Sequence, residues 1–387
     1  MKQFVQATLG TCDIEFKREK MMDFDGPADA PAVAARAPRL NEVAAAAGVS
    51  TATADRVLNR RKGVKERTVH RVLQAALDLG YLSQAEASRL ASPRPPNAAF
   101  LLPMGNNPYL RLLGDKLRAL AASRSRDGAR VRCFFIDSFD AGALAASIRH
   151  QADWADGIVF LAIDHPVVRE AVEDVTAAGK HVVTLVSDLP HPGRAAYFGL
   201  DNRAAGRTAG YLLGRFCGAG GGSVALVAGS PIYRAHSERE AGFLGLIAER
   251  FPGLRPVGTR EGHDDSDENY RHAIALMEQH PDLVGIYNVG GSSQGIGRAL
   301  REKGRAGEVV FIGHGLTPDT RRLLIDGTMD AVINSDPDAI LAGALDLLHR
   351  LRHGDPPPAA VPPVKMDLFF RENLPVAFRP ATGQRPA

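Results

Sequence analysis

The sequence has little cysteine, few aromatic residues and no long uncharged hydrophobic run. Its three cysteines, Cys12, Cys133 and Cys217, are too few and too scattered for a disulfide framework or a metal site, so we interpret them as free thiols. No run reaches the roughly 18 apolar residues that a transmembrane helix needs, and we expect no membrane partner. The glycine-rich stretch 218–222 precedes a predicted strand, unlike a dinucleotide-binding loop, and we predict no cofactor and no metal.

The start of the chain shows no secretory signal pattern. Charged residues are spread through 1–22 without an apolar core, so we expect a cytoplasmic protein. Residues 1–38 lack periodicity and end in an alanine- and proline-rich stretch, which predicts a disordered tail, with Met21 and Met22 as alternative starts of translation. A second disordered tail is predicted over 375–387. The chain of 387 residues is 45% hydrophobic and 24% charged, which indicates two or three soluble globular domains.

The small net charge of +3 conceals a basic segment. Residues 39–94 carry ten basic and five acidic side chains, a net charge of +5, whereas residues 1–38 and 95–387 each sum to −1. A basic block on a nearly neutral body is typical of a nucleic-acid-binding module attached to a separate domain. The alternative is a basic surface that only faces solvent.

The basic segment begins with a compact helical domain. A short helix over 40–47 can be capped by Asn41 and ended by Gly48, which accepts a left-handed conformation. Ser50 is a second cap candidate and opens a helix over Thr51–Leu58. This order is typical of the helix-turn-helix, whose second helix enters the DNA major groove. A plain three-helix bundle is the alternative, because a third amphipathic helix follows.

These residues carry a resemblance to a known family. Residues 40–59, with Val64, Thr68, Val72 and 79–81, closely resemble the headpiece of the lactose-repressor (LacI/GalR) family of bacterial transcription regulators. The resemblance implies that five residues contact the bases or backbone of DNA: Thr51, Ala52, Thr53, Arg56 and Asn59. Because alanine has no hydrogen-bonding side chain, the base contact of Ala52 would be apolar.

Three residues depart from the family pattern. Asp55 and Lys65 replace usual serines, and Ser83 replaces a usual proline. An acid at Asp55 would repel DNA phosphates, so that contact is not expected to follow the family.

Residues 83–97 are predicted to form a hinge helix and a linker. Gln84–Ala91 resembles the family's hinge helix, in which paired leucines at the position of Leu90 wedge into the minor groove. An ordinary linker helix is the alternative. The prolines of 92–97 favour an extended spacer.

From residue 98 onward, short apolar runs alternate with stretches of helical pattern. This alternation predicts an α/β fold of doubly wound parallel sheets, and about 275 residues exceed one such sheet, so we expect two lobes with a cleft. The predicted strands are 98–102, 131–136, 157–161, 181–186, 223–228, 284–288 and 309–313, followed by a final proline-spaced strand over 368–370.

The stretch 98–374 resembles the effector domain of the same family, which is similar to periplasmic sugar-binding proteins such as ribose-binding protein. The resemblance implies a type I periplasmic-binding-protein-like fold that binds an effector and forms a homodimer. It also implies a headpiece-proximal lobe of 98–198 and 336–361 and a distal lobe of 199–335 and 362–374.

A sugar-like ligand needs hydrogen-bonding side chains and an aromatic face, placed where parallel strands end. Candidates follow the predicted strands or match the family's ligand positions: Asn107, Tyr109, Ser187, Asp188, Arg239, Asn288, His314 and Ser335. Asp188 has a loop cap as its alternative role, and His314 a structural one. Two usual acids are absent, since Val289 follows Asn288 and Gly315 follows His314, so a standard hexose or pentose is less expected.

Residues 291–295 fit the G-x-S-x-G pattern between a strand and a helix, as a hydrolase nucleophile requires. Ser293, Asp326 and His349 occur in triad order, so a serine hydrolase is an alternative. We nevertheless predict no enzyme, because a headpiece precedes this short pattern, which recurs by chance. The acidic stretch 263–268 is predicted to be solvated surface, since it lacks the spacing of a cation site.

The sequence therefore predicts a homodimeric, sequence-specific DNA-binding transcription regulator, by hypothesis a repressor, with a small all-α headpiece at 39–82. A small polar, sugar-like effector bound between the lobes would control it allosterically by favouring one lobe arrangement. The sugar-binding protein of an importer is the alternative; it predicts a signal peptide and no headpiece.

Overall fold

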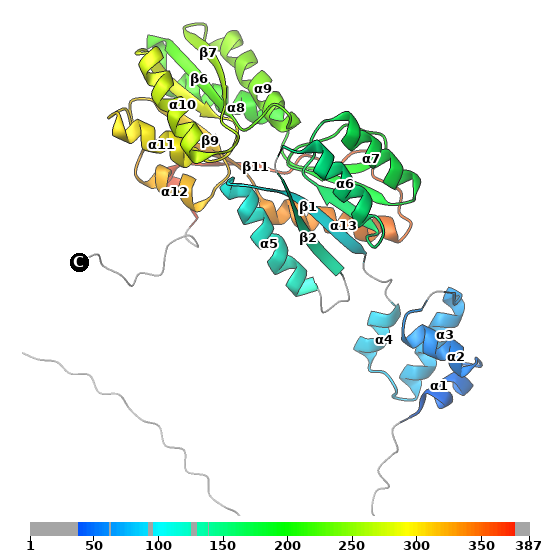
Figure 1. Cartoon of the computed structure of the whole chain (residues 1–387). Helices are drawn as coiled ribbons and strands as arrows, with labels where there is room; N and C mark the ends of the chain where they lie inside the picture. The colour runs from blue at the N-terminus through cyan, green and yellow to red at the C-terminus, as the bar shows by residue number, and fades with distance from the viewer. Residues whose placement is uncertain (1–37, 62, 92–95, 125–129, 138, 376–387) are drawn as a thin grey trace, which may run out of the picture. The chain divides into compact units, whose positions relative to one another are not determined.

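A computed structural model of the chain describes residues 38–61, 63–91, 96–124, 130–137 and 139–375 (Figure 1). The predicted disordered tails lie outside these residues except at positions 38 and 375, as does most of the proline spacer. The chain divides into two compact units between Ser88 and Arg89. No described helix is long and apolar enough to cross a membrane.

The first unit is built from three helices that contact one another: α1 (Leu40–Ala46), α2 (Thr51–Leu58) and α3 (Glu66–Asp78). Ser50 caps α2 as predicted, because its hydroxyl accepts a hydrogen bond from the Thr53 amide at 3.2 Å. Gly48 adopts a φ of +62° after α1, which is the left-handed conformation expected of it. The turn between α1 and α2 therefore follows from a glycine and a serine.

The prediction that Asn41 caps α1 is wrong. Arg39 is the N-cap residue, and the Glu42 carboxylate accepts a hydrogen bond from its backbone N–H at 2.9 Å. A glutamate three residues after the cap position can satisfy that amide, whatever side chain the cap residue itself carries.

Helix α4 (Gln84–Ala91) begins with a reciprocal capping box. The Glu86 carboxylate accepts hydrogen bonds from the Ser83 amide at 2.8 Å and from its hydroxyl at 2.7 Å. The Ser83 hydroxyl oxygen in turn accepts from the Glu86 amide at 3.3 Å. Ser83, one of the departures from the family pattern, thus stabilises the first turn of this short helix.

The second unit contains two sheets, each the centre of one lobe. The sheet of the first lobe is parallel, in the order β2-β1-β3-β4-β5. Its strands are β1 (Asn97–Met104), β2 (Arg130–Asp137), β3 (Gly157–Phe160), β4 (His181–Leu185) and β5 (Arg194–Phe198). Two helices pack on each face: α6 (Ala141–Gln151) and α7 (Pro166–Ala177) on one, α5 (Pro108–Arg124) and α13 (Pro337–Arg352) on the other.

The sheet of the second lobe has the order β11-β10-β9-β8-β6-β7, with only β11 antiparallel to its neighbour. Its strands are β6 (Gly222–Ala228), β7 (Leu254–Glu261), β8 (Leu283–Asn288), β9 (Val310–His314), β10 (Ala331–Ser335) and β11 (Met366–Phe369). The helices on one face are α8 (Asn202–Phe216) and α9 (Arg234–Arg250). Those on the other are α10 (Ser266–Gln279), α11 (Ser293–Glu302) and α12 (Pro318–Ile325). Short 3₁₀ helices occupy Gly218–Gly220 and Arg371–Asn373. The predicted α/β class with doubly wound parallel sheets is confirmed.

The chain passes between the two sheets three times, after β5, after β10 and before β11. Helix α13 therefore packs on the first sheet although the strand before it belongs to the second. Figure 1 shows α13, coloured orange, beside the much earlier α5 and β1. The connections between the lobes thus consist of three segments from distant parts of the sequence.

Three strands were not among the predicted ones: β5, β7 and β10. Strand β7 lies at the edge of its sheet, and Pro256 and Gly258 interrupt its pattern. Strand β10 is buried throughout, but its last two residues are the polar Asn334 and Ser335. An apolar run is therefore a poor signal for strands at an edge and for strands that end in a polar site.

Helices α8 and α9 approach each other closely because glycines face the neighbouring backbone. A Cβ atom on Gly206 would overlap the carbonyl oxygen of Arg239, and one on Gly242 would overlap the carbonyl oxygen of Arg203. This approach places the first turn of α8 next to the residues of α9 that reach the cavity described below.

We expect Gly206→Ala to destabilise the second lobe by about 1 to 3 kcal/mol, because the new methyl group forces the two helices apart. The matched control is Gly245→Ala in α9, where the nearest atom to an added Cβ is an arginine nitrogen 4.0 Å away. That change should be neutral or stabilise by up to about 1 kcal/mol. Chemical denaturation of the full chain measures both, and equal effects would contradict the packing argument.

Candidate ligand cavity and DNA-binding surface

A cavity lies between the two lobes, where strands of both sheets end. The space among its lining residues is about 620 Å³ when open solvent is included. Ligand sites commonly lie at such strand ends. Polar and aromatic lining residues come from both lobes: Asn107, Tyr109, Ser187, Tyr233, His236, Arg239, Asp264, His314 and Ser335. Aliphatic side chains complete much of the wall: Leu110, Leu161, Val186, Leu200, Ala235 and Ile333.

Six of the eight predicted ligand residues line this cavity: Asn107, Tyr109, Ser187, Arg239, His314 and Ser335. At the start of α5, the side-chain oxygen of Asn107 accepts a hydrogen bond from the Tyr109 amide at 2.9 Å. The Tyr109 hydroxyl lies 2.8 Å from Ser335 Oγ, at the end of β10. Burial raises the pKa of Tyr109 to about 12, so its ring presents a neutral face to the cavity.

Arg239 is the buried cation of the site. It is only 8% exposed, and its Nε donates to Asn202 Oδ1 at 2.8 Å while Nη1 donates to the Val289 carbonyl at 2.9 Å. These two bonds hold the plane of the guanidinium group. Among the described residues no carboxylate lies within 4.0 Å of it.

His314 stands at the end of β9 with its Nε2 2.6 Å from the hydroxyl of Tyr287. Burial, followed by Coulombic interactions with Arg239 and His236, lowers the pKa of His314 well below its usual value. The imidazole is therefore neutral at physiological pH. It holds the Tyr287 hydroxyl, which is the structural role, and it also lines the cavity. The next residue, Gly315, has a φ of +76°, and a Cβ there would lie 3.0 Å from the Tyr109 ring. The aspartate usual at this position would therefore press on Tyr109.

Asp188 and Asn288 do not line the cavity, contrary to prediction. One oxygen of Asp188 accepts hydrogen bonds from the Thr184 hydroxyl at 2.6 Å and from the Leu189 amide at 2.8 Å, and it lies 3.3 Å from Arg194. Asp188 is thus the loop cap that was its alternative role.

The amide nitrogen of Asn288 donates to the Gly291 carbonyl at 2.8 Å and to Ser293 Oγ at 2.9 Å. The side chain is 1% exposed and fixes the loop after β8 instead of reaching the cavity.

The largest omission of the sequence prediction is Asp264. The stretch 263–268 was predicted to be solvated surface, but Asp264 is 7% exposed and its carboxylate lines the cavity. One oxygen accepts from Asn107 Nδ2 at 2.9 Å and the other from the Gly291 amide at 2.6 Å. Recognition of β7 would have revealed it, because Asp264 follows that strand as the other candidates follow theirs. Tyr233 and His236, also missed, are the N-cap residue and a first-turn residue of α9.

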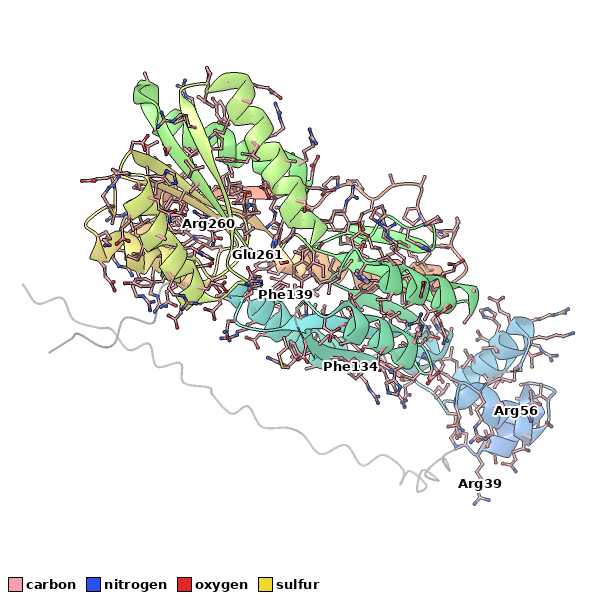
Figure 2. The ribbon with its side chains drawn as sticks, turned by 45° about the horizontal axis from the view of Figure 1, so that its top comes forward. Arg39, Arg56, Phe134, Phe139, Arg260 and Glu261 are labelled. Carbon is pink, nitrogen blue, oxygen red and sulfur yellow. The ribbon has the colours of Figure 1, made fainter. Side chains whose placement is uncertain are left out.

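Contacts between the lobes close one side of the cavity. Besides the Asn107 to Asp264 hydrogen bond, the ring of Phe139 in the first lobe packs 5.4 Å from Tyr233 and 5.8 Å from His263, both in the second. Figure 2 shows Phe139 and Glu261 close together where the lobes meet. The lobes also touch elsewhere: the Ala235 amide donates to Ser187 Oγ at 3.4 Å, and Ile232 and Tyr233 pack against the hydrophobic core of the first lobe.

The structure does not bring together the three residues of the alternative serine-hydrolase triad. The Ser293 hydroxyl oxygen accepts a hydrogen bond from the Asn288 amide at 2.9 Å, and the residue is 3% exposed. Asp326 pairs with Arg301 at 3.2 Å, and His349 belongs to α13 of the first lobe, with its ring 4.2 Å from that of His353. Among the described residues, Ser293 therefore has no hydrogen-bonded base of the kind that a serine nucleophile needs.

In the first unit, four of the five predicted DNA-contacting residues of α2 are exposed: Thr51, Ala52, Arg56 and Asn59 (Figure 2, with Arg56 labelled). Thr53 is half-buried, and its hydroxyl lies 2.9 Å from that of Ser50. Leu90, predicted to enter the minor groove, is half-buried in α4.

Asp55 is engaged on the same helix. It accepts a hydrogen bond from Asn59 Nδ2 at 2.7 Å and lies 3.1 Å from the Arg61 guanidinium. The unexpected acid is therefore balanced locally by the two neighbours that it binds.

We predict that His314 makes stability fall as the pH falls. Its pKa is depressed in the folded state, so below the unfolded value of about 6.5 the unfolded chain binds a proton that the folded chain does not. The contribution is complete above that pH and is lost at up to about 1.4 kcal/mol per pH unit below it. His314→Gln should therefore flatten unfolding free energy against pH between 7 and 5, whereas the exposed His150→Gln should not. Equal slopes in all three proteins would contradict the prediction.

Comparisons with known proteins match both units. Residues 39–84 match the family of bacterial regulatory proteins of the lacI family, and residues 98–356 match the periplasmic binding protein domain. Neither family description is of an enzyme. The ribose import binding protein RbsB of Salmonella typhimurium is 25% identical over 212 residues, 54% of this chain and 69% of that protein. The regulator GntR of Pseudomonas aeruginosa is 44% identical over 66 residues, 17% of this chain and 19% of its own.

Solved structures agree with the fold of the body. A solute-binding protein from Burkholderia graminis in complex with D-arabinose has a TM-score of 0.66 at 22% identity, covering 72% of this chain and 96% of its own. The glucose-galactose binding protein GanP of Geobacillus stearothermophilus has a TM-score of 0.64, also at 22% identity, covering 72% and 99%. With its helix-turn-helix headpiece and its periplasmic-binding-protein body, this chain belongs to the lactose-repressor family of bacterial transcription regulators.

Proposed function

We propose that this regulator is a repressor that binds its operator as a homodimer in the cytoplasm and responds to a small polar, sugar-like effector. The observation that carries the proposal is the presence, in one chain, of an exposed recognition helix and a ligand cavity between two lobes. The binding protein of an importer needs a ligand cavity but no DNA-binding headpiece, so the headpiece favours a regulator over that alternative.

The recognition helix would supply two kinds of contact. Thr51 and Ala52 begin α2 and are exposed, as residues that read base edges in the major groove must be. Arg56 and Asn59 are exposed one and two turns later, where they can reach the backbone phosphates.

The cavity offers what a polyhydroxylated ligand needs. Asn107, Arg239 and Ser187 donate or accept hydrogen bonds, while the Tyr109 ring and the aliphatic wall face the C–H surface of such a ligand. Burial between two lobes also allows the effector to change their arrangement.

Effector and DNA would be coupled through the lobes. An effector that binds one lobe arrangement more tightly shifts the population toward it, and the paired first lobes would carry that change to α4. The capping box of Ser83 and Glu86 favours a helical α4, so the effector would act mainly on the distance between two such helices.

We expect Arg56→Ala to weaken binding to operator and random DNA alike, since it removes a backbone contact, and to reduce the salt slope by about 1. Substitutions of Thr51 or Ala52 should change base preference at individual operator positions by about 1 to 3 kcal/mol. Sequence selection from a random library followed by salt-dependent binding assays measures both. A wild-type protein with no preference over random DNA at physiological salt would refute the proposed function.

Asp55 should limit DNA affinity, because it places a negative charge on the recognition helix and engages Arg61. We expect Asp55→Asn to tighten binding to operator and random DNA and to steepen the salt dependence by about one unit, as Arg61 becomes available to a phosphate. Asp78→Asn is the matched control, since this exposed acid at the end of α3 binds Gln74 and pairs with no cation in the described part of the chain. Identical effects of the two substitutions would show that only net charge matters.

A further inference from the structure

The buried guanidinium of Arg239 leaves hydrogen-bonding capacity that no described residue uses. An arginine side chain carries five N–H donors, and the bonds to Asn202 and Val289 use one on Nε and one on Nη1. Three N–H groups therefore remain, one on Nη1 and two on Nη2. Nη1 and Nη2 together can donate two parallel hydrogen bonds to the oxygens of a carboxylate.

The charge of Arg239 also lacks a close counter-ion. Buried arginines are normally paired, because an isolated charge loses its hydration without compensation. Arg239 is 8% exposed and lines the cavity, yet the described residues place no carboxylate within 4.0 Å. A negative group in the cavity would supply the missing partner.

Asp264, the other charged residue of the cavity, does not provide that partner. Its two oxygens already accept from Asn107 of the first lobe and from the Gly291 amide, and it forms no ion pair with Arg239. It acts in the contact between the lobes. His314 and His236 have pKa values lowered by burial and add neutral donors or acceptors, not a negative charge.

Helix α9 adds positive potential at the same place. Its N-cap residue, Tyr233, makes no side-chain capping bond, and residues of its first turns, Ala235, His236 and Arg239, line the cavity. The N-terminal end of a helix of 17 residues favours an anion, so the helix and the unpaired guanidinium act in the same direction.

We propose that the effector is a sugar acid with a single carboxylate, which binds Nη1 and Nη2 of Arg239 while its hydroxyl-bearing chain lies against Tyr109. This inference rests on the proposed function, since it assigns the charge of the effector of that same cavity. The cavity also holds the Asp264 carboxylate, so a monoanion adds one negative charge beside it, whereas a phosphate dianion would add two.

Matched pairs of ligands test the assignment in the full-length protein. Thermal unfolding is measured with D-gluconate against D-glucitol, D-galactonate against galactitol and D-xylonate against xylitol, with D-glucose 6-phosphate as the dianion. At least one acid should raise the unfolding temperature in proportion to the logarithm of its concentration, as a ligand of the folded state does, and exceed its neutral partner in affinity. Titration calorimetry then gives the dissociation constants.

Variants locate the carboxylate. Arg239→Gln should weaken the best acid by more than about thirtyfold and remove its advantage over the neutral partner, because a charge-assisted fork is lost. Arg239→Lys keeps the positive charge but loses the two parallel N–H donors. This variant should still bind the acid more tightly than its neutral partner, with lower affinity than the wild type. Arg234→Gln is the control, since this exposed arginine of the same helix pairs with Glu238 outside the cavity and should bind the acid as the wild type does.

Equal or tighter binding of the neutral partners, tighter binding of the phosphate, or no stabilisation by any acid would overturn the assignment. The comparison of acids with neutral partners uses the wild-type protein, so it tests the sugar-acid assignment even if Arg239→Gln does not fold. Operator binding by the same preparation is measured separately. Retained operator preference together with a neutral ligand would refute the sugar acid and leave the proposed regulator standing.

Discussion

The bonds that hold the Arg239 guanidinium join three elements of the second lobe, and the cavity depends on them. Arg239 belongs to α9, Asn202 begins α8, and the Val289 carbonyl follows β8. The three meet only because Gly206 lets the backbone of α8 approach Arg239 itself. The cation is therefore positioned by backbone packing, and its orientation does not require a ligand.

The cavity residues of the first lobe are held against the second lobe by contacts between the lobes. Each lobe has its own hydrophobic core on both faces of its sheet. The lobes meet through hydrogen bonds such as Asn107 with Asp264 and through Tyr233, which packs against the core of the first lobe. A hydrogen bond of this kind contributes about 1 kcal/mol net. A ligand that contacts both walls adds to these contacts and so shifts the population toward the lobe arrangement that it bridges.

The sequence predicted the fold class and most of the cavity because apolar strands and the polar residues after them are local patterns. Tyr109 was found in this way, whereas Arg239 was found from the family resemblance and the Ser50 cap from a local helix-start pattern. Asp264 was missed because an acidic run is usually solvated, and its burial comes from Asn107 and Gly291, which are remote in sequence. The prediction for Asp188 differs from the structure for the opposite reason. Asp188 follows a strand, but its carboxylate is engaged by Thr184 and Arg194. Such competition between nearby partners is decided by geometry that no local pattern contains.

The cavity has its carboxylate at Asp264 and none at Gly315. The family resemblance implies an aspartate at position 315, but the backbone there is left-handed and a Cβ atom would lie 3.0 Å from the Tyr109 ring, so that side chain would be strained and crowded. The cavity's carboxylate instead follows β7, where Asp264 is bound to the Gly291 amide and to Asn107. A carboxylate there accepts hydrogen bonds that close the lobes, whereas one after β9 would be free to accept from a ligand. The change removes an acceptor for ligand hydroxyls and leaves the N–H groups of Arg239 as the strongest donors in the cavity, which favours a ligand that supplies the acceptors itself.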